Sequence, residues 1–163
     1  MHFLTNMEPL PLEAFKVSIV GEAPEVVAAG SEFQVPLKLQ NLGTGIFSSR
    51  PPYPVHFTYS WFHILDNIET KSGDENIRTR LPRVVPPQYT LECALTVQAP
   101  KEAGTYRLQA SLIQEWITRF DAVDPNNAYS AIIEVEDDLV REIGNPVLAI
   151  ALQNKTAMRA ASR

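Results

Sequence analysis

The sequence of 163 residues predicts an all-β protein folded as an antiparallel β-sandwich. Six segments alternate apolar and polar side chains with a period of two, as strands do when one face is buried and the other is wet. Turn-like segments separate them, and 13 prolines against 7 glycines disfavour long helices. The sequence has no strand–helix alternation and no internal repeat. A chain of this length is long enough to bury a hydrophobic core.

The expected strands follow one another along the central part of the chain. They span residues 15–20, 33–40, 55–62, 91–98, 106–113 and 129–136. Pro36 lies inside the second one. Because proline cannot donate a ladder hydrogen bond, we expect that strand to lie at a sheet edge or to carry a bulge. Residues 1–13 are expected to form an N-terminal arm, and the sandwich domain is expected to span 14–137.

The hydrophobic period changes after the last strand. Asn145 and Pro146 are typical of a helix N-cap and first helical position, and an Ala- and Leu-rich segment follows them. We therefore expect residues 138–163 to form a short C-terminal helical tail. The sequence leaves three alternatives open for this tail: a frayed or loosely packed helix, a helix that binds a partner, and a disordered segment.

Two local features indicate an immunoglobulin-like sandwich. Residues 104–108 place Tyr106 where such folds turn a tyrosine hydroxyl back onto upstream backbone, the tyrosine corner. Trp61 lies in the middle strand, where these folds bury a tryptophan. Together the two features favour the immunoglobulin-like arrangement over other sandwiches.

Composition excludes several classes of function and suggests a compartment. The net charge is −5 and no dense basic cluster appears, so neither nucleic acid nor an anionic membrane is an expected partner. No apolar run approaches ~18 residues, so no membrane span is expected. The start lacks the pattern of a signal peptide and Cys93 is the single cysteine, so the cytoplasm is the expected location.

The sequence contains no convincing catalytic or metal-binding constellation. His56 and His63 are seven residues apart on an alternating strand, so their side chains are expected on opposite faces. Asp121 and Asp124 could hold calcium, but the glycine of an EF-hand loop is missing. Nucleotide-binding motifs are absent. We therefore expect no cofactor, no metal ion and no enzymatic activity.

Aromatic and charged residues gather in three segments. Residues 59–62 are rich in aromatic rings, residues 77–83 hold three arginines, and residues 114–120 combine both kinds. Aromatic rings stack on the apolar face of a sugar, while arginine, glutamine and glutamate pair with its hydroxyls. The same residues also suit an ordinary core edge with an arginine–carboxylate pair. The residues alone leave both interpretations open.

A family resemblance extends this pattern. It rests on TYSW at 58–61, IRTRLP at 77–82, PP at 86–87, VQAPKEAGTYRL at 97–108 and LIQE at 112–115. These motifs resemble a bacterial sandwich module that occurs beside glycosyltransferases and methyltransferases of surface-polysaccharide assembly. The module is similar to the C-terminal carbohydrate-binding domain of the ATPase subunit of O-antigen ABC transporters. The resemblance covers residues 30–136.

The resemblance implies roles for matching residues. Tyr59 and Trp61 correspond to core aromatics, and Arg78 and Glu115 to an ion pair between a loop and a strand. The chain departs from the pattern at three places: Trp116 replaces a glycine, Arg119 a tryptophan, and Pro87-Gln88 a glycine-containing turn. We expect the loop at 66–83 to frame a ligand surface together with nearby side chains. The candidate ligand-binding residues are Arg78, Arg80, Glu115, Trp116, Arg119 and Phe120.

The resemblance implies a non-catalytic module that binds a glycan or polysaccharide during bacterial surface-glycan assembly or export. A glycosyltransferase, a methyltransferase or an ABC transporter would then be its partner chain. The alternative is a protein-interaction or structural immunoglobulin-like domain, including a homodimer. A groove lined by aromatic residues favours a glycan, whereas an apolar stripe on the terminal helix favours interaction with a protein.

Overall fold

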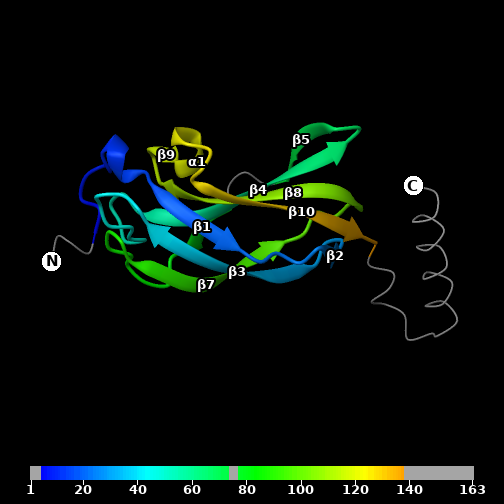
Figure 1. Ribbon diagram of the computed structural model, residues 1–163, viewed down its shortest axis with the longest axis horizontal. Helices are drawn as coiled ribbons and strands as arrows, with labels where there is room; N and C mark the ends of the chain where they lie inside the picture. The colour runs from blue at the N-terminus through cyan, green and yellow to red at the C-terminus, as the bar shows by residue number, and fades with distance from the viewer. Residues whose placement is uncertain (1–4, 74–76, 138–163) are drawn as a thin grey trace, which may run out of the picture.

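The computed structural model describes residues 5–73 and 77–137, and these residues form a two-layer β-sandwich (Figure 1). The small sheet has the order β1 (Val17–Gly21), β3 (Glu32–Asn41), β7 (Thr90–Gln98). The large sheet has the order β2 (Val26–Ala28), β10 (Ala128–Glu136), β8 (Gly104–Gln114), β4 (Val55–Leu65), β5 (Ile68–Ser72). Two short strands extend it, β6 (Thr79–Arg80) beside β4 and β9 (Thr118–Arg119) beside β8. The predicted fold class is confirmed.

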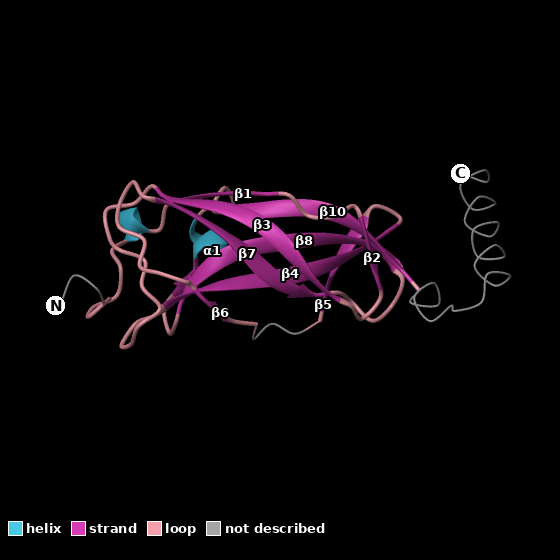
Figure 2. Ribbon diagram, turned by 90° about the horizontal axis from the view of Figure 1, so that it is seen from below, coloured by secondary structure: helices cyan, strands magenta, loops and turns pink. Residues whose placement is uncertain are grey.

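Strand pairing is antiparallel throughout the described residues, except that β2 runs parallel to β10. The described helices are one-turn elements, the 3-10 helix η2 (Leu12–Ala14) and α1 (Phe120–Val123) (Figure 2). The helix predicted at 146–161 lies outside the described residues. No helix within the described ranges is long and apolar enough to cross a membrane.

The core fills the space between the sheets with alternate side chains of each strand. The small sheet contributes Leu37, Leu39 and Leu95, and the large sheet contributes Leu108, Leu112 and Ile133. Tyr59 and Trp61 of β4 are each 4% exposed, which confirms them as core aromatics. The six predicted strands are β1, β3, β4, β7, β8 and β10, because each carries this alternation.

The position of Pro36 corrects one prediction. The strand that contains it, β3, is the central strand of the small sheet, not an edge strand. The carbonyl of Pro36 accepts from Glu22 N at 3.1 Å, so its nitrogen faces the same side, just beyond the last paired residue of β1, Gly21. Proline is tolerated here because the missing donor falls where the β1 ladder ends.

The tyrosine corner predicted at Tyr106 is present. Its hydroxyl donates to the carbonyl of Glu102 at 3.0 Å, four residues upstream. Burial raises the pKa of this phenol, and the nearby Glu102 carboxylate adds to the shift, so the donor proton is retained. This hydrogen bond ties the loop between β7 and β8 to the side chain of Tyr106 on β8.

Replacing Tyr106 with phenylalanine is expected to lower the free energy of unfolding by about 1 kcal/mol, since the Glu102 carbonyl loses its donor. Chemical denaturation monitored by tryptophan fluorescence measures the change. Tyr89→Phe is the matched control, because Tyr89 is 60% exposed. A Tyr106→Phe variant as stable as the parent protein would remove the corner's stabilising role.

Candidate functional site

The outer face of the large sheet, the face turned away from the small sheet, collects most of the candidate residues. Four residues form a row across this face, one from each of four neighbouring strands. Arg119 of β9 pairs with Ile113 of β8, Ile113 pairs with His56 of β4, and His56 pairs with Arg80 of β6. Residues paired in this way share one face of a sheet. Since neighbouring strands lie about 4.8 Å apart, this row spans about 14 Å. The fold thus aligns two candidate arginines that are 39 positions apart in sequence.

A cluster of ionisable side chains includes His56, which lies in the middle of this row. Arg78 Nε donates to Glu115 Oε1 at 2.5 Å, which confirms the predicted loop-to-strand pair. His56 Nδ1 lies 3.4 Å from the same carboxylate oxygen. The backbone of Glu115 donates to the carbonyl of Pro54, which fixes the strand end. Arg78, Glu115 and His56 are called the turn cluster below.

Trp116 lies at the turn between β8 and β9, directly after Glu115. Its side chain is 84% exposed, and its backbone φ is 69°, in the left-handed region. The turn closes through a hydrogen bond from Ile117 N to Gln114 O at 3.1 Å. A non-glycine residue in this conformation costs roughly 1–2 kcal/mol. The chain therefore places a large aromatic ring in solvent at a position whose backbone favours glycine.

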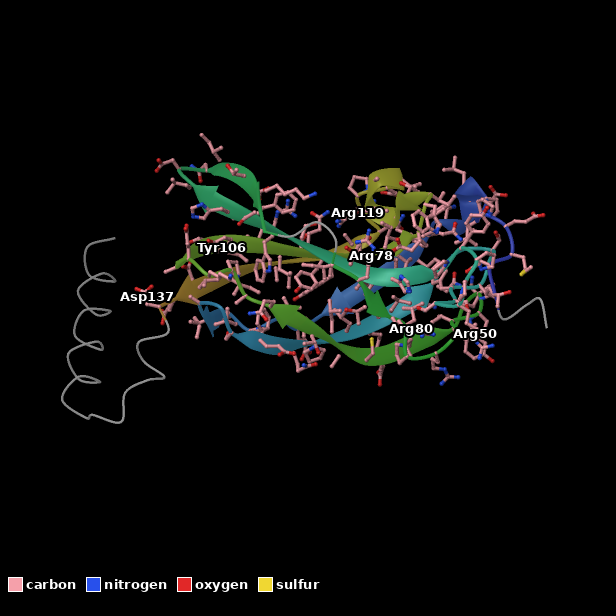
Figure 3. All side chains as sticks on the ribbon, turned by 180° about the vertical axis from the view of Figure 1, so that it is seen from behind. Arg50, Arg78, Arg80, Tyr106, Arg119 and Asp137 are labelled. Carbon is pink, nitrogen blue, oxygen red and sulfur yellow. The ribbon has the colours of Figure 1, made fainter. Side chains whose placement is uncertain are left out.

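A second group of polar side chains, which includes Arg119 (Figure 3), continues along the same face. Arg119 contacts Asp121 Oδ2 at 2.8 Å and donates to Ser60 Oγ at 2.8 Å. Gln109 Nε2 donates to the same Asp121 oxygen at 2.7 Å. The network thus joins β4, β8 and α1.

Arg107 extends this network toward β5. It pairs with both carboxylate oxygens of Glu69, at 2.8 and 2.9 Å, and also donates to Gln109. Its guanidinium carbon lies 4.3 Å from the centre of the Phe62 ring. The hydrogen bond from Arg107 holds the pKa of Glu69 below its usual value, so the carboxylate stays ionised. We call Glu69, Arg107, Gln109, Asp121, Arg119 and Ser60 the outer-face network.

Asp121 is the most buried carboxylate of this network, with 6% of its side chain exposed. Burial alone would raise its pKa, but the hydrogen bonds from Arg119 and Gln109 outweigh burial, so the pKa of Asp121 is lowered. An aspartate with a lowered pKa stabilises the fold above its unfolded pKa and loses that contribution as the pH falls through its folded pKa.

Asp121→Asn is therefore expected to cost about 1–3 kcal/mol of stability at pH 7. The difference from the parent protein should shrink as the pH falls below about 4. Urea denaturation from pH 7 to pH 2 measures this. Glu92→Gln is the control, because Glu92 and Lys38 form an exposed pair at 3.5 Å. A gap between parent and variant that stayed constant with pH would contradict the role of the charge.

Phe120 corrects the predicted ligand surface. Its side chain is fully buried, with ring contacts to Phe15 at 4.9 Å and to Phe47 at 5.2 Å between centroids. Although Arg119 beside it faces outward, α1 turns the Phe120 ring into the core. Phe120 therefore frames no ligand surface.

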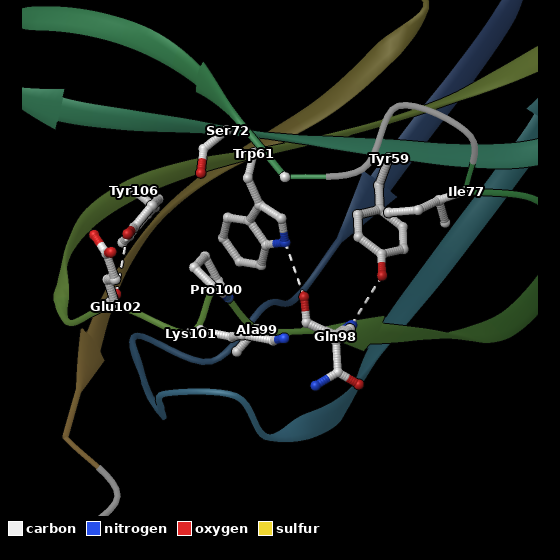
Figure 4. A pocket seen from close by; sticks show the side chains of 11 residues that line it. Tyr59, Trp61, Ser72, Ile77, Gln98, Ala99, Pro100, Lys101, Glu102 and Tyr106 are labelled. Atoms are coloured by element: carbon white, nitrogen blue, oxygen red, sulfur yellow. Dashed lines mark hydrogen bonds between the residues drawn. The ribbon is translucent and has the colours of Figure 1, made fainter.

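A pocket of about 520 Å³ opens between β4 and the end of β7 (Figure 4). The rings of Tyr59, Trp61 and Tyr106 form its walls. The Tyr59 hydroxyl accepts from Gln98 N at 2.9 Å, and Trp61 Nε1 donates to Gln98 O at 3.0 Å. These bonds hold β7 against β4. Each of the three rings is at most 4% exposed, so the pocket offers little aromatic surface to a ligand.

The histidines and the cysteine lie apart. His56 faces outward toward Glu115, whereas His63 packs on the Tyr106 ring inside, with centroids 4.9 Å apart, so the predicted opposite faces are confirmed. Burial raises the pKa of the half-buried Cys93 thiol. Within residues 5–73 and 77–137, no group of histidine, cysteine and carboxylate side chains could hold a metal ion.

Sequence reasoning missed Arg107 and Gln109, and it singled out residues 59–62 without assigning Ser60 to a polar network. In the structure Ser60 is buried, and Arg107 and Gln109 are half-buried, on strand positions where polar residues usually face water. Their grouping depends on the β4–β8 register, in which Ser60 stands opposite Gln109. The spacing between these residues in the sequence does not indicate how β4 and β8 pair.

The chain matches no family model and no curated protein. Among solved structures, it is similar to the CARDB domain of a Pyrococcus furiosus protein at 15% identity, covering 74% of this chain and 94% of that one, with a TM-score of 0.42. A β-glucosidase from Listeria innocua matches at 9% identity over 74% of this chain and 16% of that enzyme, with a TM-score of 0.47. The sporulation control protein Spo0M of Bacillus subtilis matches at 14% identity over 74% and 49%, with a TM-score of 0.42.

Proposed function

We propose that this chain is a non-catalytic glycan-binding module that serves bacterial surface-polysaccharide assembly or export. The observation that carries the proposal is Trp116, whose ring is 84% exposed on a left-handed turn. An indole held in solvent at a position that favours glycine lowers stability. Stacking of this ring on the apolar face of a sugar would explain why the chain carries a residue that lowers its stability.

The side chains around Trp116 suit a sugar's hydroxyl groups. Glu115 precedes it and is fixed by Arg78 at 2.5 Å, while Arg119 follows on β9. Planar guanidinium and carboxylate groups that are already oriented lose little entropy when they bind hydroxyls. A shallow face of this kind gives weak affinity per site. A tethered glycosyltransferase, methyltransferase or transporter chain, or a homodimer, would supply avidity.

The carboxylates on this face support binding rather than catalysis. Glu69, Glu115 and Asp121 are each paired with an arginine, at 2.8, 2.5 and 2.8 Å. An arginine partner stabilises the ionised form of a carboxylate. The pKa values of Glu69 and Asp121 are lowered, so these two carboxylates stay ionised, whereas a glycosidase needs one carboxyl that stays protonated.

A bacterial glycan array with the intact protein tests the proposal, with Trp116→Ala measured beside it. We expect one class of polysaccharide to bind and the Trp116 variant to lose the signal. Tyr89→Ala is the matched control, since Tyr89 is an aromatic residue that is 60% exposed outside the proposed site. Silence across the array, or equal binding by Trp116→Ala, would contradict it.

One observation favours a protein partner as a second candidate function. Leu65 and Ile68 face each other across the β4–β5 turn and are 63% and 67% exposed, on a hairpin that projects from the sandwich (Figure 1). This exposed pair at a hairpin tip offers apolar surface to a protein partner. Sedimentation of Leu65→Ser/Ile68→Ser against the parent protein tests it. A dimer that dissociates in the variant would favour this function, and a parent monomer would count against self-association.

A further inference from the structure

Three exposed arginines have no ion-pair partner among the described residues: Arg50, Arg80 and Arg83. The arginines of the turn cluster and the outer-face network differ, because Arg78, Arg107 and Arg119 each contact a carboxylate. The chain holds 19 acidic against 14 basic residues, so acidic partners are not scarce. Two of the three unpaired arginines, Arg50 and Arg80, lie on neighbouring segments and are called the positive region below.

The loop that carries Arg50 and the strand that carries Arg80 lie side by side. Ser49 Oγ donates to the carbonyl of Val55 at 2.7 Å and accepts from Leu81 N at 2.8 Å. This hydroxyl ties together the residues that directly precede Arg50 and follow Arg80. Both arginines appear on the same side of the molecule in Figure 3. A bridge between Phe47 and Val85 holds the same two segments together farther along.

The positive region adjoins the proposed sugar surface. Arg80 stands opposite His56 in the β4–β6 ladder, and His56 lies 3.4 Å from Glu115. Trp116 follows Glu115 in the chain. A ligand stacked on the Trp116 ring and extended across β4 would therefore reach Arg80.

We infer that the glycan is acidic, and that Arg50 and Arg80 bind a carboxylate or phosphate group that it carries beside the sugar stacked on Trp116. This inference rests on the proposed function. Guanidinium groups bind carboxylates and phosphates through two parallel hydrogen bonds, which neutral sugars cannot match. The other arginines of this face are occupied by carboxylates, so the anion would bind at the free ones.

The arrangement suits an acidic glycan better than nucleic acid. Glu69, Glu115 and Asp121 lie on the same face and would repel a phosphate at every step of a nucleic-acid strand. The net charge of −5 adds to that repulsion. An acidic polysaccharide such as polygalacturonate, alginate or hyaluronate carries at most one carboxylate on each sugar, and its rings also offer apolar faces that can stack on Trp116.

The double variant Arg50→Gln/Arg80→Gln tests the inference. The probes are polygalacturonate, alginate and hyaluronate, each beside its carboxyl-reduced neutral form. We expect the full-length protein to bind at least one acidic polymer at least tenfold more tightly than its reduced form. The double variant should lose at least tenfold in affinity, and higher salt should weaken binding of the parent protein. Lys16→Gln/Lys38→Gln removes the same charge from exposed positions on β3 and just before β1, and should bind as the parent does.

The outcomes separate this inference from the proposed function. Tight binding that survives carboxyl reduction, or that the double variant retains, would overturn the acidic ligand and leave glycan binding intact. Duplex DNA bound as tightly as the acidic polymers, with the same loss in the double variant, would identify a general polyanion surface and overturn it as well. If neither these polymers nor the bacterial array bind, the proposed function fails and the inference fails with it.

Discussion

Replacing Trp116 with glycine is expected to abolish glycan binding and, in the same variant, to raise the free energy of unfolding by about 0.5–1 kcal/mol. The indole is 84% exposed, so its removal forfeits little packing. Its backbone φ of 69° costs a tryptophan roughly 1–2 kcal/mol, and glycine avoids that cost. Glycine in turn lowers the free energy of unfolding by about 0.5–1 kcal/mol, because it has greater conformational freedom in the unfolded chain. A gain in stability together with a loss of binding is typical of residues kept for function.

Two measurements on three variants test this expectation. Urea denaturation gives stability, and titration with the polysaccharide found on the array gives affinity. Trp116→Ala should lose binding as fully as Trp116→Gly but should gain no stability, because alanine keeps the left-handed strain. Trp116→Phe should retain part of the affinity, since it keeps an aromatic ring. A glycine variant that is less stable than the parent, or that binds equally well, would refute the argument.

Strands with two different faces were predictable from the sequence. β3 and β7 each bury one face and expose most of the other, and β8 alternates buried with half-buried residues. Apolar residues therefore recur at every second position, as in Val35, Leu37 and Leu39. Trp61 and Tyr106 were predictable because each is a large amphipathic side chain inside such a pattern. The predicted boundaries differ from the observed ones by at most three residues.

Short or uniformly exposed strands escaped prediction. β5 exposes nearly all of its residues on both faces, so Ile68–Ser72 carries no alternation. The signal that was available is the turn before it, where Asp66 and Asn67 adopt positive φ values of 52° and 63°. Aspartate and asparagine tolerate this conformation, and a two-residue turn of this kind closes a hairpin. β6 and β9 have only two residues each, too few for any periodicity.

The candidate site was predictable where sequence neighbours are also neighbours in space. Glu115 and Trp116 share one turn. Arg78 lies 37 positions from Glu115, and only the family resemblance predicted that pair. The unpaired Arg50 was not predictable, because it comes near Arg80 only through the Ser49 hydrogen bonds. No spacing between Arg50 and Arg80 in the sequence indicates that their segments are neighbours in the fold.

Phe120 failed as a surface residue because the chain leaves the β-strand pattern beside it. Arg119 is the last residue of β9, and α1 begins at Phe120. Asn127 holds this corner, since its side-chain amide donates to the carbonyls of Phe15 and Phe120 at 2.8 and 3.0 Å. Neighbours in sequence thus acquire opposite roles, one on the outer face and one in the core.

Phe120→Ala is accordingly expected to lower the free energy of unfolding by about 3–5 kcal/mol, the usual cost of deleting a fully buried aromatic side chain. The cavity would open against Phe15 and Phe47, whose edge-to-face contacts with Phe120 would be lost as well. A loss of this size is a large part of the stability of a small domain. Thermal and urea denaturation of the full chain, followed by circular dichroism, measure it.

The conservative variant separates the core role from a ligand role. Phe120→Leu keeps most of the volume and should cost clearly less stability than Phe120→Ala. Because the ring is 0% exposed, the folded Phe120→Leu protein should bind the polysaccharide with unchanged affinity at a temperature well below its unfolding midpoint. If Phe120→Leu folded as stably as the parent but bound the polysaccharide tenfold more weakly, Phe120 would contact the ligand as first predicted. The same pair of measurements on Trp116→Gly should give the opposite result, with stability raised and binding lost at a position only four residues earlier in the chain.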